Sequence, residues 1–94
     1  MAFFAIHYTY TPATASLRDQ YRPAHRAWLG EHFTAGNVLL SGAYPDGSGA
    51  LIVVRAADLD AATAFIGNDP FLTNDAVDGV RVVEWNQVYG PFED

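Results

Sequence analysis

The stretch that decides the fold is VLLSGAY (38–44), followed by PDGSG (45–49) and ALIVVR (50–55). The first and third segments are rich in the apolar and β-branched residues that favour strands. The segment between them consists almost entirely of the residue types that turns require. We therefore predict a β-hairpin whose strands cover residues 38–44 and 50–55.

Strand and helix patterns flank the hairpin on both sides. Phe4, Ile6 and Tyr8 alternate with smaller or polar residues, which is typical of a strand with one face toward a core. In chain order the predicted elements are a strand over 3–10, a helix from about Pro23 to Ala35, the hairpin, a helix that Asp58 begins and Gly67-Asn68 ends, and a strand over Val80 to Tyr89. This βαββαβ order predicts an α+β, ferredoxin-like fold with a four-stranded antiparallel sheet.

The predicted strands are apolar on both of their faces. Leu51 and Val53 alternate with Ile52 and Val54, so neither face of the third strand is polar. Two helices can cover one face of such a sheet, and monomers seldom leave a large apolar patch in water. We therefore expect a homodimer, sheet against sheet, that encloses a cavity. Residues 1–94 are expected to form a single domain.

Composition narrows the classes of function. The chain has no cysteine, and its five basic residues are all arginine against 11 acidic ones, for a net charge of -6. This charge disfavours binding to nucleic acid and to anionic membranes. The apolar start of the chain is short and is read as a strand rather than a signal peptide, and no apolar run approaches the length of a membrane span. A cytoplasmic location is expected.

His25 is the first candidate for chemistry. Ser16 and Asp19 resemble a capping box that opens a short helical turn, and Pro23 suits the first position of the helix that follows. His25 would then lie at a helix start, where the partial positive charge disfavours the imidazolium form. A neutral imidazole can accept a proton, as a general base must.

Asp69 is the second candidate. Because Pro70 follows it, Asp69 is an ideal N-cap for a turn through Phe71. A carboxylate has two oxygens, so one could cap the turn while the other accepts a hydrogen bond from His25. A His and an Asp on separate elements, in a small acidic chain, suggest a small-molecule site.

The chain resembles the YciI-like (YCII-related) family of the dimeric α+β barrel group. The frame Arg22-Pro23-Ala24-His25, the frame Asp69-Pro70-Phe71 and the order of the residues between them carry the resemblance, which extends over nearly the whole chain. The resemblance implies a dimeric barrel and a His/Asp pair in a pocket, here His25 and Asp69. It also implies acid/base chemistry of the elimination, dehydrochlorination or isomerisation type, without naming a substrate.

Four further residues are candidates for binding a substrate. Arg22 could clamp a carboxylate or phenolate, or it could be a solvated arginine. Ser41 could donate a hydrogen bond, Phe71 could pack against a planar ring or simply belong to the core, and His7 could line the cavity or lie at the dimer interface. His32 lies roughly 10 Å from His25 along the helix axis, too far to share a metal ion without help from elsewhere. We expect neither a metal site nor a cofactor.

Two functions remain open at this point. The first is a cofactor-independent lyase or isomerase with His25 as acid/base and Asp69 orienting it. The alternative is a non-catalytic dimeric module that binds a small ligand or another protein. We expect a base in an open pocket to contribute little packing, whereas a structural histidine would be buried without access to the cavity.

Overall fold

The computed structural model describes residues 1–93 and has the predicted order of elements. The four strands are Ala2–Thr9 (β1), Val38–Ala43 (β2), Gly49–Ala56 (β3) and Gly79–Trp85 (β4). The helices are a 3₁₀ turn at Pro12–Thr14 (η1), Ala15–Thr34 (α1), Leu59–Ile66 (α2) and Pro70–Thr73 (α3). Within residues 1–93, no helix combines the length and the apolar character that crossing a bilayer would need.

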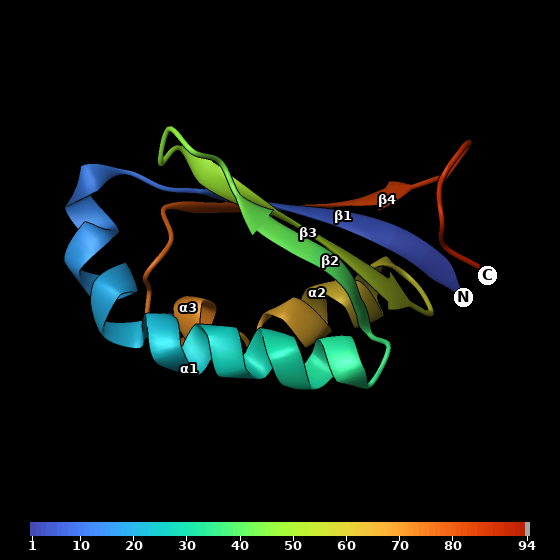
Figure 1. Cartoon of the computed structure of the whole chain (residues 1–94), viewed down its shortest axis with the longest axis horizontal. Coiled ribbons are helices and arrows are strands. Elements are labelled where there is room, and N and C mark those ends of the chain that lie inside the picture. The colour runs from blue at the N-terminus through green and yellow to red at the C-terminus, as the bar shows by residue number, and fades with distance from the viewer. Residues whose placement is uncertain (94) are drawn as a thin grey trace.

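The strands form one antiparallel sheet in the order β2-β3-β1-β4. Ile6 pairs with Ile52 of β3 and with Val82 of β4, so these three side chains lie on the same face. All of the α-helices lie along one side of the sheet (Figure 1). The predicted ferredoxin-like α+β fold is therefore confirmed for one chain.

The core lies between the sheet and the helices. The largest fully buried side chains are Phe4, Ile6, Ile52, Ile66, Val38, Val54 and Asp69. Six of the seven are apolar, which the alternation in the strands predicts. Asp69 is the exception, and a buried carboxylate needs polar partners to offset the loss of its water.

The helix that carries His25 begins earlier than predicted. It starts at Ala15, so Pro23 lies inside it rather than at its first position. In Figure 1 the helix changes direction after its first turns, as expected where a proline removes a backbone hydrogen bond. The predicted capping box is also wrong, because Ser16 and Asp19 both lie within α1 and its N-cap, Thr14, makes no side-chain cap hydrogen bond.

Contacts to Arg18 and Asp78 hold the first turns of α1 in place. The buried Arg18 guanidinium donates to the Thr11 carbonyl oxygen at 3.0 Å and to the Ala76 carbonyl oxygen at 3.2 Å. Asp78 accepts hydrogen bonds from the Thr11 backbone N–H at 2.8 Å and from the Thr14 hydroxyl at 2.6 Å. These tertiary contacts explain why the helix extends on the N-terminal side of Pro23, where sequence propensity alone predicts a break.

The second helix begins as predicted, while the last strand is shorter than predicted. Asp58 accepts a hydrogen bond from the Ala61 backbone N–H at 2.8 Å and caps α2. The strand predicted to reach Tyr89 ends at Trp85. Beyond it the Gln87 side chain bonds the backbone of Phe92, whose ring meets Phe3 edge-on with 5.9 Å between centroids. The C-terminal segment therefore turns back toward the helix-free face (Figure 1).

Candidate functional site

His25 and Asp69 meet although 44 residues separate them in the chain. His25 Nδ1 lies 2.7 Å from Asp69 Oδ1 and 3.0 Å from Oδ2. An ionised carboxylate can only accept hydrogen bonds, so in this contact Nδ1 carries the proton and donates the hydrogen bond. In a neutral imidazole the other ring nitrogen, Nε2, is then an acceptor.

Asp69 is fixed by three donors from three parts of the chain. Its Oδ1 accepts from the Phe71 backbone N–H at 3.0 Å as well as from His25, and its Oδ2 accepts from the Tyr8 hydroxyl at 2.6 Å. One oxygen therefore both caps α3 and receives His25, where the sequence suggested one oxygen for each task. Hydrogen bonds of this kind are what allow a carboxylate with 0% exposure to remain buried.

Tyr8 serves this arrangement as a donor. Burial raises the pKa of Tyr8, and the charge of Asp69 and the hydrogen bond to it raise the pKa further. The hydroxyl therefore keeps its proton at neutral pH and donates a hydrogen bond to Asp69. Tyr8 lies on the same face of β1 as Phe4 and Ile6, which aims it from the sheet toward the helices.

Phe71 fixes the plane of the imidazole. The two rings are stacked with 3.7 Å between their centroids and 2° between their planes. Phe71 is held by the short helix α3, which Asp69 caps and Pro70 begins. Asp69 therefore orients the His25 ring in two ways: it accepts a hydrogen bond at one edge of the ring, and it caps the helix that holds Phe71 against one face.

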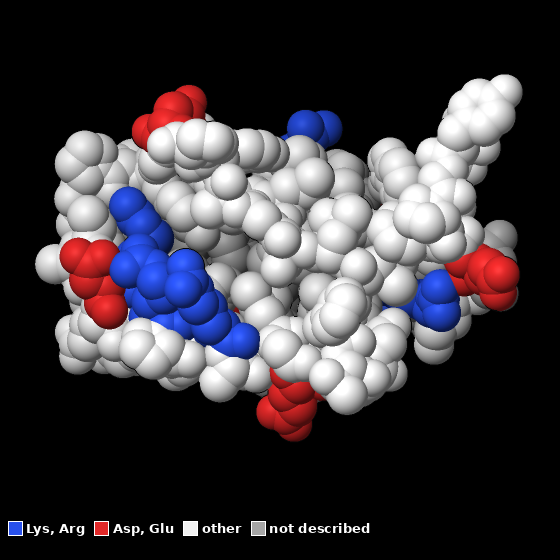
Figure 2. Space-filling view, in the orientation of Figure 1, with Lys and Arg blue, Asp and Glu red and all other residues white. Residues whose placement is uncertain are grey.

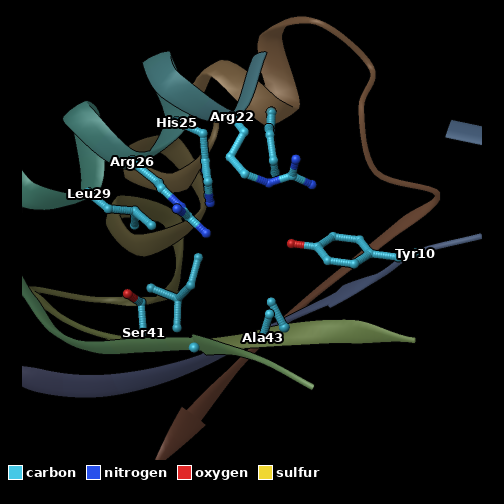
Figure 3. Close-up of a pocket in the computed structure, with 11 residues that line it drawn as sticks. Tyr10, Arg22, His25, Arg26, Leu29, Ser41 and Ala43 are labelled. Carbon is cyan, nitrogen blue, oxygen red and sulfur yellow. The ribbon is translucent and has the colours of Figure 1, made fainter. Parts of the chain in front are cut away.

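The remaining edge of His25 borders a cavity. This cavity of about 290 Å³ lies between α1 and the β2–β3 edge of the sheet. It is lined by Tyr10, Arg22, His25, Arg26, Leu29, Ser41, Gly42, Ala43, Ala50, Ile52 and Phe71. Figure 3 shows His25 projecting from α1 into this space, with Ser41 and Ala43 on the strand opposite.

Two arginines give the cavity a basic wall in an acidic protein. Arg22 and Arg26 both line it, and Figure 2 shows basic side chains gathered beside a hollow on this face. Arg22 also donates to Asp19 at 2.7 Å, an exposed ion pair one turn back on the same helix. Among residues 1–93 no hydrogen bond or ion pair engages the side chain of Arg26.

Tyr10 closes one end of the cavity. The Arg18 guanidinium lies 4.3 Å from the centre of the Tyr10 ring, and the Phe71 ring meets it edge-on. Burial is the largest influence on the pKa of Tyr10 and raises it, so the Tyr10 hydroxyl is protonated at neutral pH. Figure 3 shows that hydroxyl pointing into the cavity, toward the side chains of α1.

The predicted site residues separate into two groups. Arg22, Ser41 and Phe71 lie together with His25 around the cavity. His7 does not, because it pairs with Leu51 and Arg81 and therefore lies on the helix-free face of the sheet. The cavity expected from the sequence lies between the sheets of two copies, on this same helix-free side, so both alternatives for His7 remain predictions.

The reason given for His25 from the sequence is wrong in one respect. His25 lies in the middle of α1, ten residues after Ala15, so the positive end of a helix does not act on it. Its environment is set instead by Asp69 and Phe71. His25 is therefore influenced by its hydrogen bond to Asp69 and its stacking on Phe71, and not by the helix dipole.

Three site residues could not be singled out from the sequence. Tyr8 was one of several aromatic residues in a strand, Tyr10 follows two positions later, and Arg26 stands in a helix among other polar residues. A signal for Tyr8 existed, because a tyrosine on a core-facing strand position needs a partner for its hydroxyl.

In the described part of the chain, no group of three or more metal-ligating side chains could hold an ion.

Comparison with known proteins agrees with this architecture. A family model described as YCII-related domain matches residues 2–86. A solved structure of 5-chloro-2-hydroxyhydroquinone dehydrochlorinase from Burkholderia phenoliruptrix AC1100, in complex with 2,5-dihydroxybenzoquinone, superposes with a TM-score of 0.76 at 24% identity. The match covers 89% of this chain and 93% of that one, and at this identity it shows a shared fold. No curated protein matches the chain.

Proposed function

The chain belongs to the YCII-related domain family, and we propose that it is a cofactor-independent enzyme that moves a proton on a small molecule. The observation that carries this proposal is the contact of 2.7 Å between His25 Nδ1 and the fully buried Asp69, on an imidazole whose other edge borders a cavity. In this role His25 is the acid/base group and Asp69 orients it.

The proposed step begins with Nε2. This nitrogen takes a proton from an acidic C–H or O–H of the substrate, and the imidazolium that forms is stabilised by the Asp69 carboxylate. The electron pair left on the substrate moves into a conjugated system, as in an enolate. It then either expels a leaving group, which is elimination, or accepts the proton from His25 at another atom, which is isomerisation.

The other residues of the cavity support substrate binding in this proposal. Arg22 would hold an anionic oxygen, Ser41 would offer a hydrogen bond, and Phe71 would present part of an apolar wall to a ring. The structurally similar dehydrochlorinase was solved with a small quinone, which supports a planar substrate for this cavity. The meeting of His25 and Asp69 at the edge of an accessible cavity favours an enzyme over the non-catalytic binding module.

Proton exchange tests this proposal without knowledge of the natural substrate. The protein is incubated in D₂O with single-ring carbon acids, namely hydroxyquinones, cyclic enols and unsaturated lactones, and loss of C–H signal is followed by proton NMR. The wild type should accelerate exchange in at least one class. His25→Gln should slow that exchange on the order of 100-fold or more, the scale of general acid–base catalysis.

His32→Gln is the matched control, because His32 lies on the same helix but packs against Trp28 and Phe65 instead of the cavity. Exchange should be unchanged in that variant. Exchange that is equal in His25→Gln and wild type, or that no probe undergoes above the background rate, would contradict the proposal. Binding of the probes without exchange would favour the non-catalytic module.

We further propose that the protein is a homodimer that associates through the helix-free face. Leu40 and Trp85 belong to that face and remain 39% and 37% exposed. Neighbouring positions on the same face, Leu51 and Val83, are half-buried and also apolar. Burial of this face in a second copy would remove apolar surface from water.

A further inference from the structure

We propose that the substrate of this site is a small planar carboxylate, bound between Arg22 and Arg26 with its ring over the apolar wall of the cavity. This inference rests on the proposed function and adds the class of substrate to it. Four features of the cavity carry it: its charge, the spacing of its arginines, its donor at the far end and its size.

The charge of the cavity contrasts with that of the chain. The protein has a net charge of -6 and five arginines, and two of those five line this cavity. The carboxylates nearby are already engaged, since Asp69 accepts from three donors and the exposed Asp19 pairs with Arg22. A cavity with two guanidinium groups and no carboxylate lining it favours an anion.

The spacing of the two arginines points the same way. Arg22 and Arg26 are four residues apart on α1 and therefore lie on one side of the helix. Like charges at this spacing destabilise a helix, and Asp19 offsets the charge of Arg22 alone. An anion between the two guanidinium groups would remove the repulsion, and guanidinium matches the paired oxygens of a carboxylate better than a single oxygen.

Tyr10 and the apolar lining define the rest of the ligand. Figure 3 shows Arg22 and Arg26 extending from α1 into the same space as His25, with the Tyr10 hydroxyl facing them. That hydroxyl is a neutral donor for an anionic or carbonyl oxygen. Leu29, Ile52 and Phe71 contribute apolar side chains to the lining of the same cavity.

The volume of the cavity limits the size of the ligand. At about 290 Å³ it lies just below the roughly 300–1,000 Å³ found for small-molecule sites. A single ring with one or two substituents fits that range, whereas a nucleotide or a coenzyme is too large. A carboxylate on Arg22 and Arg26 would leave the ring next to His25, where a proton can be removed.

Paired probes test the carboxylate requirement by binding alone. Benzoate, salicylate and 2-furoate are compared with benzamide, salicylamide and 2-furamide by titration calorimetry at low salt. At least one carboxylate should bind the wild type about tenfold or more tightly than its amide, a difference of about 1.4 kcal/mol. Added salt should weaken only the carboxylates, since it screens the arginines.

Substitution of the arginines then locates the site. Arg26→Gln and Arg22→Gln should each remove most of the preference for the carboxylate, while Arg26→Lys should restore part of it. Arg81→Gln is the matched control, because Arg81 faces the helix-free side of the sheet. Equal binding of carboxylates and amides, no binding of any carboxylate, or the same loss in Arg81→Gln would overturn the inference.

The outcome is separable from that of the proposed function. Binding is measured without turnover, and His25→Gln keeps both arginines, so its preference for carboxylates should persist while its proton exchange is lost. Exchange on uncharged probes without any preference for carboxylates would refute the substrate class and leave the enzyme proposal intact. A strong preference for carboxylates without exchange in any probe would refute only the enzyme proposal.

Discussion

At the residue scale, His25 combines two properties that the sequence suggested were alternatives. Its side chain is 11% exposed, and its ring is stacked on Phe71 and hydrogen-bonded to Asp69, as expected of a structural histidine. Its second edge nevertheless borders the cavity, as expected of a base. A stability loss on replacing His25 therefore carries no argument against catalysis, because orientation of the ring requires the same contacts that stabilise the fold.

His25→Ala should lower the free energy of unfolding by about 1–3 kcal/mol, because Asp69 loses one of its donors while it stays buried. Asp69→Asn should lower the free energy of unfolding by a similar amount. The double variant should lower it by less than the sum of the two single variants. Urea unfolding of the four proteins measures both quantities. Strictly additive losses would show that the two side chains do not interact in solution.

Tyr8→Phe should lower the free energy of unfolding by about 1.5–3 kcal/mol, the scale of a hydrogen bond to a charged group. In the proton-exchange assay we expect a lower rate with little change in the binding of the probe, because Tyr8 acts through Asp69 and does not line the cavity. Tyr21→Phe on α1 is the control for the loss of a tyrosine hydroxyl. Equal losses in the two variants would contradict the role of Tyr8 in holding Asp69.

The raised pKa of Tyr8 also predicts how stability changes at alkaline pH. Burial raises the pKa of the Tyr8 hydroxyl in the folded protein above its ordinary value of 10.0, which applies to the unfolded chain. Above pH 10 the unfolded chain therefore loses this proton, while the folded protein retains it. Stability therefore falls as the pH rises through 10. The fall should be less steep in Tyr8→Phe, and identical slopes in the two proteins would contradict the burial of this hydroxyl.

At the element scale, the strands could be predicted and the start of α1 could not. The alternation at Phe4, Ile6 and Tyr8 reflects a sheet with one side against helices, and Asp58 caps a helix through its own backbone neighbours. Such local signals can be read from the chain. The first turns of α1 depend instead on Arg18 and Asp78, which bond partners 58 to 67 residues away and, for Arg18, also Thr11, the residue that caps η1.

The same distinction applies to the site. His25 and Asp69 each stand in a recognisable local frame, and the structure brings them together as the sequence suggested. Tyr8 and Arg26 carry no such frame, since their roles arise from where β1 and α1 pack. Tertiary packing also overruled the local preference of Pro23 for a helix start, which removed the helix-end field from His25.

Asp78→Asn tests the contacts that hold the start of α1. Hydrogen bonds from Thr14 and Thr11, with a smaller influence of Arg18, lower the pKa of Asp78 below its ordinary value of 3.8. A lowered pKa contributes stability above that value, which is lost as the pH falls through the pKa of the folded state. The variant should therefore be less stable than wild type at pH 7, and the difference should shrink toward pH 3.

Asp75→Asn in the same connection is the control for this prediction, because Asp75 takes no part in these contacts. Thermal melts between pH 7 and pH 3 follow both variants. A gap between wild type and Asp78→Asn that stays constant over this range, or that also appears for Asp75→Asn, would contradict the role given to Asp78.

At the scale of the whole molecule, the two faces of the sheet differ in what lies on them. The helix-covered face holds the core and the cavity, and the helix-free face presents Leu40, Trp85 and His7. Association through the second face would leave the residues that line the cavity in place. We therefore expect that dimer formation and ligand binding can be changed independently.

Leu40→Glu tests the proposed interface. A charge at this half-exposed position on the helix-free face should convert a homodimer to monomers, because the face could no longer be buried without leaving a carboxylate unpaired. Leu59→Glu is the matched control on α2, where a leucine is 49% exposed on the opposite side of the molecule. Light scattering at micromolar concentration gives the mass, and a monomeric wild type would contradict the proposal.

The central claim is that Asp69 holds the proton of His25 on Nδ1 and leaves Nε2 available to a substrate. Nitrogen-15 NMR of protein labelled in histidine measures this directly at about pH 8.5, roughly two units above the ordinary imidazole pKa. We predict an Nδ1–H tautomer for His25 in the wild type and its loss in Asp69→Asn. A proton on Nε2 in the wild type, or the same tautomer in both proteins, would contradict the account.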